Sequence, residues 1–391
     1  MARYKLGEIC EIVSGSTPKT DVAEYWDGTE KWITPAELND ESYIIYDSAR
    51  KLTELGVKKT GLTPFPEGTV ILSSRAPIGK VAIAGCEMCC NQGFKNLICS
   101  DIINNRYLYW FLKGNTAYLN SLGRGATFKE ISKQIVASIE INVPSQAEQL
   151  AAVEQLEKVT DVIRLRRAQL QKLDELVKAR FVELFGDPER NPKKWPVVSI
   201  TEIIRGKVSN GFFAKRDAYR NDGNVQVLGV ANIVNRMYSN IEGLPRTNAT
   251  QAEKEKYRVK YGDMLFCRSS LVAEGIGKAS IVPQDTPQNV LFECHVIRLP
   301  LDQQKCVPEF VQALSTTPYF RKQIIAQSKT ATMTTIGQDG ILKAAIILPP
   351  VELQQEFLRF VEQTGKSKVA VQKALDETQR LLDCLTQDFF G

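Results

Sequence analysis

The stretch VPSQAEQLAAVEQLEKV, residues 143–159, returns as LPPVELQQEFLRFVEQT at residues 348–364, and the two copies align without a gap. Each copy opens with proline, which is common in the first turn of a helix because the N–H groups there have no partner inside the helix. The same register places FVELFG at residues 181–186 on TQDFFG at residues 386–391. The chain therefore contains the same long helical segment twice.

Apolar residues recur every seven positions along these segments, which is typical of the seam of a coiled coil. The predicted seam consists of Leu156, Ile163, Leu170, Val177 and Leu184 in the first segment and of Phe357, Val361, Val371, Leu375, Leu382, Leu385 and Phe389 in the second. Roughly forty residues at about 1.5 Å each give a helix about 60 Å long. We expect the two helices to pair, although each could instead lie against its own globular segment as an ordinary amphipathic helix.

The remainder of the chain is repeated less closely. YKLGEICEIVSG at residues 4–15 matches WPVVSITEIIRG at residues 195–206. Gly186 and Pro188 are expected to stop the first helix, and the polar run at residues 186–196 is typical of a short linker. We therefore expect a pseudo-two-fold internal repeat, in which a globular segment that mixes short strands and helices is followed by a long helix.

A strand-turn-strand element occurs once in each globular segment, as GTVILSSRAPIGKVAIAG at residues 68–85 and GDMLFCRSSLVAEGIGKASIV at residues 262–282. Its Ile-Gly-Lys resembles part of a phosphate-binding loop, but that loop needs a glycine five positions before Gly79 or Gly277 and a hydroxyl residue after the lysine. Neither copy has them. The sequence therefore argues against a nucleoside triphosphate site, and two strands around a polar, basic turn instead suit contact with an anionic partner.

Length and composition indicate a multidomain globular protein. A chain of 391 residues exceeds one ordinary core, so we expect at least two domains. No apolar run is long enough to span a bilayer and the N-terminus lacks a signal-peptide pattern, so we expect a cytoplasmic location. The nine cysteines have no disulfide-framework spacing and are expected to be reduced. A net charge of +5 is compatible with a nucleic-acid partner without requiring one.

The sequence offers little for catalysis. Its one histidine, His295, lies in the apolar run LFECHVIRLP and is expected to be a strand residue rather than a general acid or base. Cys86, Cys89 and Cys90 could approach a metal, but a structural zinc site wants a second pair of ligands and only Cys99 is near. The sequence shows neither a glycine-rich cofactor loop after a strand nor a methyltransferase signature. We expect a non-catalytic recognition component with no metal or cofactor of its own.

The arrangement resembles one known family, the DNA specificity (S) subunits of type I restriction-modification systems. The resemblance is carried by LGEICEIVSGSTPKT, YWDGTEKWITPAEL, LSSRAPIGKVAIA, NQGFKNL, GATFKEISKQIVASIEINVPSQAEQ and FGDPERNPKKWPVVSI. Their order, the repeat and both helices extend it over essentially the whole chain. The second half matches more loosely, since CRSSLVAE stands where the first half has SSRAP.

The resemblance implies an α+β fold in which two target recognition domains are separated by an antiparallel coiled coil of the two long helices. The expected division is a first target recognition domain at residues 1–142, a spacer helix at 143–186, a linker and second target recognition domain at 187–347, and a second spacer helix at 348–391. The implied function is to read a bipartite, asymmetric site in double-stranded DNA and to direct partner subunits to it.

The implied partners are methyltransferase (M) subunits, two in number, and in some systems restriction-translocase (R) subunits. S-adenosylmethionine would belong to the methyltransferase partner, and ATP with Mg²⁺ to the restriction partner.

Candidate DNA contacts are polar and basic side chains in predicted loops, because such side chains bind phosphates and the edges of bases. The predicted contacts are Ser16, Thr17, Lys19, Ser74, Arg75, Lys80, Asn91, Gln92, Lys95, Arg124, Thr127, Asn210, Lys215, Arg216, Arg268, Ser269, Lys278, Lys329 and Thr330. Each could also be an ordinary solvated surface residue.

Two other readings remain open at this point. A fused restriction-methylation enzyme would need motor or methyltransferase motifs, which the sequence lacks. A coiled-coil scaffold that binds only protein would leave the two basic, polar turns unexplained.

Overall fold

The computed structural model describes residues 2–75, 77–125 and 129–391, and the chain divides into two compact units. Unit 1 comprises Met1–Ala168 and Gln372–Gly391, and unit 2 comprises Gln169–Val371. Both units mix helices and strands, which confirms the predicted α+β class. The boundaries between the units fall inside the two long helices, whereas the predicted division had placed them at the helix ends.

The strands of unit 1 are β1 (Ala2–Lys5), β2 (Cys10–Ser14), β3 (Trp26–Ile33), β4 (Ile44–Ile45), β5 (Arg50–Leu52), β6 (Val70–Leu72), β7 (Val81–Ala84), β8 (Cys89–Cys90), β9 (Lys95–Cys99) and β10 (Glu140–Val143). Its shorter helices are α1 (Leu6–Ile9), η1 (Ala23–Tyr25), η2 (Pro35–Glu37), α2 (Glu54–Thr60), α3 (Asn105–Gly114), α4 (Thr116–Ser121) and α5 (Lys133–Ser138). The strands form three sheets, of order β2-β9-β6-β7-β4, β5-β3-β8 and β1-β10.

The predicted strand-turn-strand element of unit 1 is present. β6 and β7 pair antiparallel with Val70 opposite Ile83, and β6 also pairs with β9. Every residue of β6 and β7 is buried. A continuous apolar run suits this position, because a strand inside a sheet that is covered on both faces has no side exposed to water.

The strands of unit 2 are β11 (Val197–Ser199), β12 (Ser209–Asn210), β13 (Val225–Leu228), β14 (Arg246–Thr247), β15 (Asp263–Cys267), β16 (Ser269–Ser270), β17 (Ala279–Ile281), β18 (Val290–Phe292), β19 (Val296–Pro300), β20 (Lys329–Thr330), β21 (Thr334–Thr335) and β22 (Ala345–Ile347). Its shorter helices are η3 (Ile200–Ile203), η4 (Arg216–Ala218), η5 (Val230–Asn232), α7 (Gln251–Tyr257), η6 (Ala273–Gly275), α8 (Pro308–Ser315), α9 (Pro318–Ala326) and α10 (Gln338–Leu342). The sheets have the orders β12-β19-β15-β17, β14-β13-β18, β16-β21-β20 and β11-β22.

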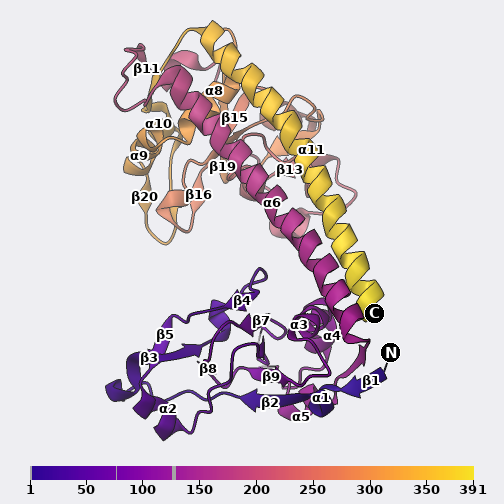
Figure 1. The fold of residues 1–391 in the computed structure, drawn as a ribbon. Coiled ribbons are helices and arrows are strands. Elements are labelled where there is room, and N and C mark those ends of the chain that lie inside the picture. Colours follow the sequence, from indigo (N-terminus) through magenta and orange to yellow (C-terminus); the bar gives the residue numbers. More distant parts are fainter. Residues whose placement is uncertain (1, 76, 126–128) are drawn as a thin grey trace. The chain divides into compact units, whose positions relative to one another are not determined.

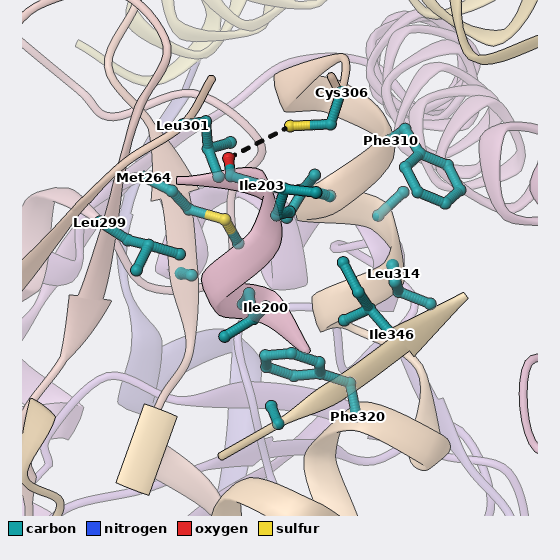
Figure 2. Close-up of a cluster of buried hydrophobic side chains, with 14 of the residues drawn as sticks. Ile200, Ile203, Met264, Leu299, Leu301, Cys306, Phe310, Leu314, Phe320 and Ile346 are labelled. Atoms are coloured by element: carbon teal, nitrogen blue, oxygen red, sulfur yellow. Dashed lines mark hydrogen bonds between the residues drawn. The ribbon is translucent and has the colours of Figure 1, made fainter. Parts of the chain in front are cut away.

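The main core of unit 2 lies where β15, β19 and α8 meet η3 and β22. Figure 2 shows part of it, with Met264 and Leu299 from neighbouring strands close to Ile203 of η3. Cys306 Sγ donates to the carbonyl oxygen of Ile203 at 3.9 Å, as the dashed line in Figure 2 marks. Phe310 of α8 extends this core toward the long helices.

The two long helices are α6 (Gln146–Phe185) and α11 (Val351–Phe390) (Figure 1). The predicted starts at residues 143 and 348 are three residues too early. Val143 still pairs with β1 as the last residue of β10, and Leu348 N–H donates to Pro196 O at 2.8 Å, so both residues belong to the globular parts. Within the described ranges, no helix has both the length and the apolar character needed to cross a bilayer.

The helix stop predicted at Gly186 is present. Gly186 adopts a φ of +79°, a left-handed conformation that glycine accepts without a steric cost and that commonly ends helices. Its N–H donates to Val182 O at 2.8 Å and thereby caps the last turn of α6.

Within each unit the N-terminal part of one long helix packs with the C-terminal part of the other, so the pairing is antiparallel. In unit 2, Phe357 of α11 contacts Phe181 and Phe185 of α6, with ring centroids 5.7 Å apart in both pairs. Arg180 Nη2 also lies 2.5 Å from Glu356 Oε1. In unit 1, Arg166 of α6 donates to the carbonyl oxygen of Ala374 in α11.

The predicted seam residues differ in burial. The buried ones are Leu156, Ile163, Leu184, Phe357 and Val361, and the partly buried ones are Leu170, Val177, Val371, Leu375, Leu382, Leu385 and Phe389. Many of them join the core of a globular unit as well as the helix pair: Leu156 belongs to the core of unit 1 and Phe357 to that of unit 2. Pairing and packing on the globular part, which we treated as alternatives, therefore both occur.

A buried glutamine in the first turn of each long helix fixes that helix to its unit. Gln149 Oε1 accepts from Asn104 N–H at 2.7 Å, and its Nε2 donates to the carbonyl oxygens of Ile102 and Pro144 at 3.1 and 3.0 Å. Gln354 has the same role in unit 2. Its Oε1 accepts from Val307 N–H, just before α8, at 2.8 Å, and its Nε2 donates to Pro349 O at 2.7 Å. Each amide thus joins the start of a long helix to the start of α3 or α8.

We predict that Gln149→Leu destabilises unit 1 by about 3 kcal/mol, because the substitution preserves the size of the side chain but leaves buried N–H and C=O groups without partners. Gln146→Leu is the matched control: Gln146 Nε2 makes one hydrogen bond, to Asp101 O, at an exposed site. We expect it to cost less than about 1 kcal/mol. Urea unfolding of both variants measures the difference, and equal losses would contradict the role given to Gln149.

Candidate nucleic-acid interface

In unit 1, backbone hydrogen bonds hold the turn after β6 from both sides. Ser73 N–H donates to Lys80 O at 2.9 Å, which closes the turn on itself. Ser74 N–H donates to Gly93 O at 2.7 Å, which ties the turn to the segment before β9. Arg75, the next residue, is therefore presented at a defined place on the surface.

Two paired residues from much later in the chain, Arg124 and Glu130, lie beside the same turn. Arg124 and Glu130 exchange backbone hydrogen bonds with N–O distances of 3.0 and 2.9 Å, and Glu130 also forms an antiparallel bridge with Arg75. Ile131 N–H donates to Ser74 O at 2.9 Å. The pairing brings Arg75 and Arg124 to either side of Glu130.

One carboxylate is surrounded by several cations at this place. Glu130 Oε2 lies 2.9 Å from Arg75 Nε, and Glu130 Oε1 lies 3.4 Å from Lys95 Nζ. Lys95 is only 8% exposed, so its charge needs this counterion. Arg124 and Lys133 line a depression of about 600 Å³ that Lys95 and Glu130 also border. We call Arg75, Lys95, Arg124 and Lys133 the unit 1 cationic cluster, whose positive charge exceeds the single negative charge of Glu130.

The loop after β2 adjoins this region. Ser16 N–H donates to the carbonyl oxygen of the last residue of β8 at 3.1 Å, and Thr17 Oγ1 bonds to Gln92 Oε1. Asn91 Oδ1 accepts from Gly93 N–H at 2.9 Å, and the carbonyl oxygen of Gly93 accepts from Ser74 N–H in the turn that precedes Arg75. Lys19 is exposed on the same loop. Ser16, Thr17, Asn91 and Gln92 are thus joined by backbone and side-chain hydrogen bonds to the segment that holds the Arg75 turn.

Two predicted contacts of unit 1 do not fit the structure. Ser74 is fully buried, and Lys80 Nζ donates to the carbonyl oxygens of Pro35 and Leu38 at 3.0 and 2.5 Å. Both predictions are corrected: these side chains hold the turn together and are not available to DNA, because their polar atoms are used inside the unit. Thr127 lies outside the described residues.

In unit 2, several predicted DNA contacts lie on the small sheet formed by β16, β21 and β20. β16 pairs with β21, with Ser269 opposite Thr335, and β21 pairs with β20, with Lys329 opposite Thr335. Thr330 Oγ1 and Thr334 Oγ1 lie 3.0 Å apart across the hairpin. Ser269, Lys329 and Thr330 therefore lie on one small sheet.

Two more side chains join this sheet. His295 Nδ1 lies 2.7 Å from Ser269 Oγ, and Arg268 Nη1 donates to Cys294 O at 3.1 Å. Burial raises the pKa of the Cys294 thiol, so that group stays uncharged beside Arg268. We call the following residues the unit 2 polar cluster: Arg268, Ser269, His295, Lys329 and Thr330.

The expected strand position of His295 is wrong. The chain turns between β18 and β19 at this residue, and the side chain is exposed beside the unit 2 polar cluster. The apolar run suggested a strand at His295 because the residues on both sides of the turn lie in strands, β18 before it and β19 after it.

The other predicted contacts of unit 2 lie outside the unit 2 polar cluster. Asn210 ends β12 and pairs with β19 two residues beyond His295, which brings it near the unit 2 polar cluster. Lys278 Nζ donates to a side-chain amide oxygen at 2.8 Å on a different loop. Lys215 and Arg216 are exposed at η4.

Sequence analysis missed Glu130, Lys133 and His295 as members of these surfaces. Glu130 and Lys133 lie in GATFKEISK, where three charged residues close together in a predicted loop were a usable signal. The place of His295 depends on a turn inside an apolar run, for which the sequence offers no clear signal.

Comparisons with known proteins identify the family of this chain. The model of the type I restriction modification DNA specificity domain matches residues 1–175 and again residues 192–378. The MjaIX type I restriction enzyme specificity subunit of Methanocaldococcus jannaschii is 30% identical, over 97% of this chain and 90% of that protein. The EcoKI specificity subunit of Escherichia coli is 25% identical, over 70% of this chain and 61% of that protein.

Solved structures share the fold. A chain from a study of complex assembly and conformational transition of the type I R-M system has a TM-score of 0.62 at 17% identity, covering 100% of this chain and 97% of that one. The type I restriction-modification S subunit from M. genitalium has a TM-score of 0.55 at 11% identity, covering 100% and 96%.

The chain belongs to the family of type I restriction-modification DNA specificity subunits, as the resemblance predicted. Its role is DNA recognition, and the prediction of a specificity subunit rather than an enzyme is confirmed by this membership.

We predict that Arg75→Gln weakens DNA binding and lowers the slope of log K against log salt by about one, as expected when one phosphate contact is lost. Lys80→Gln is the matched control. It also removes one positive charge, five residues after Arg75, but the Lys80 side chain is bonded inside the unit. It should leave the salt slope unchanged and lower the unfolding midpoint. Titrations of DNA at several salt concentrations check both, and a reversed order would contradict the assignment of the two side chains.

Proposed function

We propose that this specificity subunit reads a bipartite, asymmetric DNA site, with one half-site contacted by unit 1 and the other by unit 2. Each unit has its own core and its own exposed polar surface, which supports independent reading. The exposed members of the unit 1 cationic cluster, which exclude the buried Lys95, and the unit 2 polar cluster would contact phosphates and base edges, for which arginine, lysine and hydroxyl side chains are suited.

The observation that carries this proposal is the agreement of strand orders between the units. The order β2-β9-β6-β7 in unit 1 has its counterpart in β12-β19-β15-β17 of unit 2, and β5-β3-β8 has its counterpart in β14-β13-β18. The pair β1-β10 likewise corresponds to β11-β22. This agreement supports a pseudo-two-fold repeat of two target recognition domains.

The two surfaces differ in chemistry, which supports an asymmetric site. Arg75, Glu130 and Arg124 lie across three paired segments in unit 1. The three strands of the small sheet in unit 2 place Ser269, Thr335 and Lys329 in the same order. Unlike donor and acceptor patterns select unlike base pairs in the major groove.

The long helices are the spacer in this proposal, and they form an antiparallel coiled coil that sets the distance between the half-sites. The partners proposed are two methyltransferase subunits, which would bring S-adenosylmethionine, and restriction-translocase subunits, which would bring ATP and Mg²⁺. The site of action would be the cytoplasm, where a bacterial or archaeal chromosome is accessible.

The proposal predicts that exchanging residues 195–348 for those of a relative changes one half-site and leaves the other intact. Sequencing of methylated adenines after assembly with the methyltransferase would report both halves at once. A change in both half-sites would contradict independent reading. If the complex retains no DNA sequence selectively at moderate salt, the protein-only scaffold is the better explanation.

A second prediction concerns the spacer. Inserting one matched heptad in each long helix adds about 10.5 Å at about 1.5 Å per residue while it keeps the seam in register. The preferred gap between half-sites should then grow by about three base pairs at about 3.4 Å each. Mapping of methylated sites measures the gap, and methylation at an unchanged gap would show that the helices do not set it.

A further inference from the structure

Three apolar side chains are exposed at the edge of the unit 2 polar cluster. Leu271 is 81% exposed, Val272 is 59% exposed and Met333 is 38% exposed. We call these three residues the apolar tip. Single exposed apolar residues are common on proteins, whereas a contiguous group of them with a polar rim is typical of an interaction site.

The backbone holds the apolar tip together. Ser270 pairs with Thr334 between β16 and β21, so Leu271 and Met333 are the next residues along the two paired strands. Val272 N–H donates to Ser270 Oγ at 3.3 Å, and Gly275 N–H donates to Val272 O at 3.1 Å. Leu271 therefore lies at the surface, on a turn whose backbone is held by hydrogen bonds.

The turn has little room to fold the leucine inward. A Cβ on Gly275 would lie 2.0 Å from Ser270 Oγ, so the two sides of the turn already touch. Gly277 N–H donates to Cys267 O at 2.8 Å, which closes the base of the turn.

The charged side chains on the small sheet beside the apolar tip are cationic, while the turn itself carries one exposed carboxylate, Glu274. Arg268 precedes β16, and Lys329 lies on β20 opposite β21. Ser269 and Thr330 add hydroxyl groups on the same small sheet. A partner that fits both features must present negative charge beside a small apolar group. The DNA major groove does so, because phosphates border it and the C5-methyl of thymine is the apolar group on its base edges.

We propose that Leu271 contacts the C5-methyl group of a thymine in the half-site read by unit 2, with Val272 and Met333 flanking it. The proposal rests on the proposed function and deepens it by naming one base. In the matching turn of unit 1, residues 73–80, the large aliphatic side chain is Ile78, which is buried, so the first half-site should lack an equivalent contact.

The test replaces thymine by deoxyuridine, which removes only the methyl group. The site is first mapped by sequencing methylated adenines, and duplexes are then made with one thymine at a time replaced in either half. Binding is measured with the assembled complex of this chain and its methyltransferase. One replacement in the second half-site should weaken binding about fourfold, the value expected for one buried methyl-sized group.

The Leu271→Ala variant makes the test specific. It should weaken binding to the thymine duplex by about the same fourfold factor and lose its sensitivity to that one deoxyuridine. Leu271→Met should keep the preference for thymine, because methionine retains an apolar contact. Since Leu271 is almost fully exposed, these variants remove no core packing. Val197→Ala, at another exposed apolar residue of unit 2, should behave as the unchanged chain.

Several outcomes overturn the contact. They are a second half-site without an A·T pair, full deoxyuridine sensitivity in Leu271→Ala with unchanged affinity, and full deoxyuridine sensitivity in Leu271→Ala with both duplexes bound more weakly by the same factor. The last result, together with increased 2-aminopurine fluorescence on binding of the unchanged chain, would indicate a wedge between base pairs instead. If the unchanged complex binds its mapped site but ignores every deoxyuridine, only this contact fails. If it does not bind the mapped site, the proposed function itself fails.

Discussion

The structure depends on a buried amide in the first turn of each long helix. Gln149 and Gln354 each bond to the backbone at the start of a short helix, α3 or α8. These short helices pack on the strands that lead into the recognition surfaces, α3 on β6 and β7 and α8 on β15 and β17. Apolar packing alone tolerates rotation and sliding, whereas a glutamine with several fixed partners does not. The direction of each long helix is thereby fixed relative to the surface of its own unit.

The sequence predicts well what local patterns determine. The seven-residue apolar recurrence and the prolines predict both long helices to within three residues, and the two apolar runs of the repeated element predict β6 with β7 and β15 with β17. The repeat also identifies the family, because the order of many weak segments is specific as a whole.

The recognition surfaces could be predicted only in part, because distant residues form them. Arg75 pairs with Glu130, 55 residues later in the chain, and no local period marks that pairing. Lys80 and Lys95 look like surface lysines in sequence, yet one binds backbone carbonyl oxygens and the other is buried against a carboxylate. Polar composition identifies candidates for contact, but burial decides which of them keep a free polar group.

Unit 1 is built from two separate pieces of the chain, and this has a consequence during synthesis. Phe390 packs on Tyr107 and Phe111 of α3, with ring centroids 5.0 and 6.0 Å apart, so unit 1 is complete only when the last turn of α11 has left the ribosome. At about 5–20 residues per second, roughly 10 to 45 s separate the emergence of residue 168 from that of residue 390. For that time a nascent unit 1 exposes an apolar surface that α11 later covers, and transiently exposed apolar surface of this kind favours aggregation.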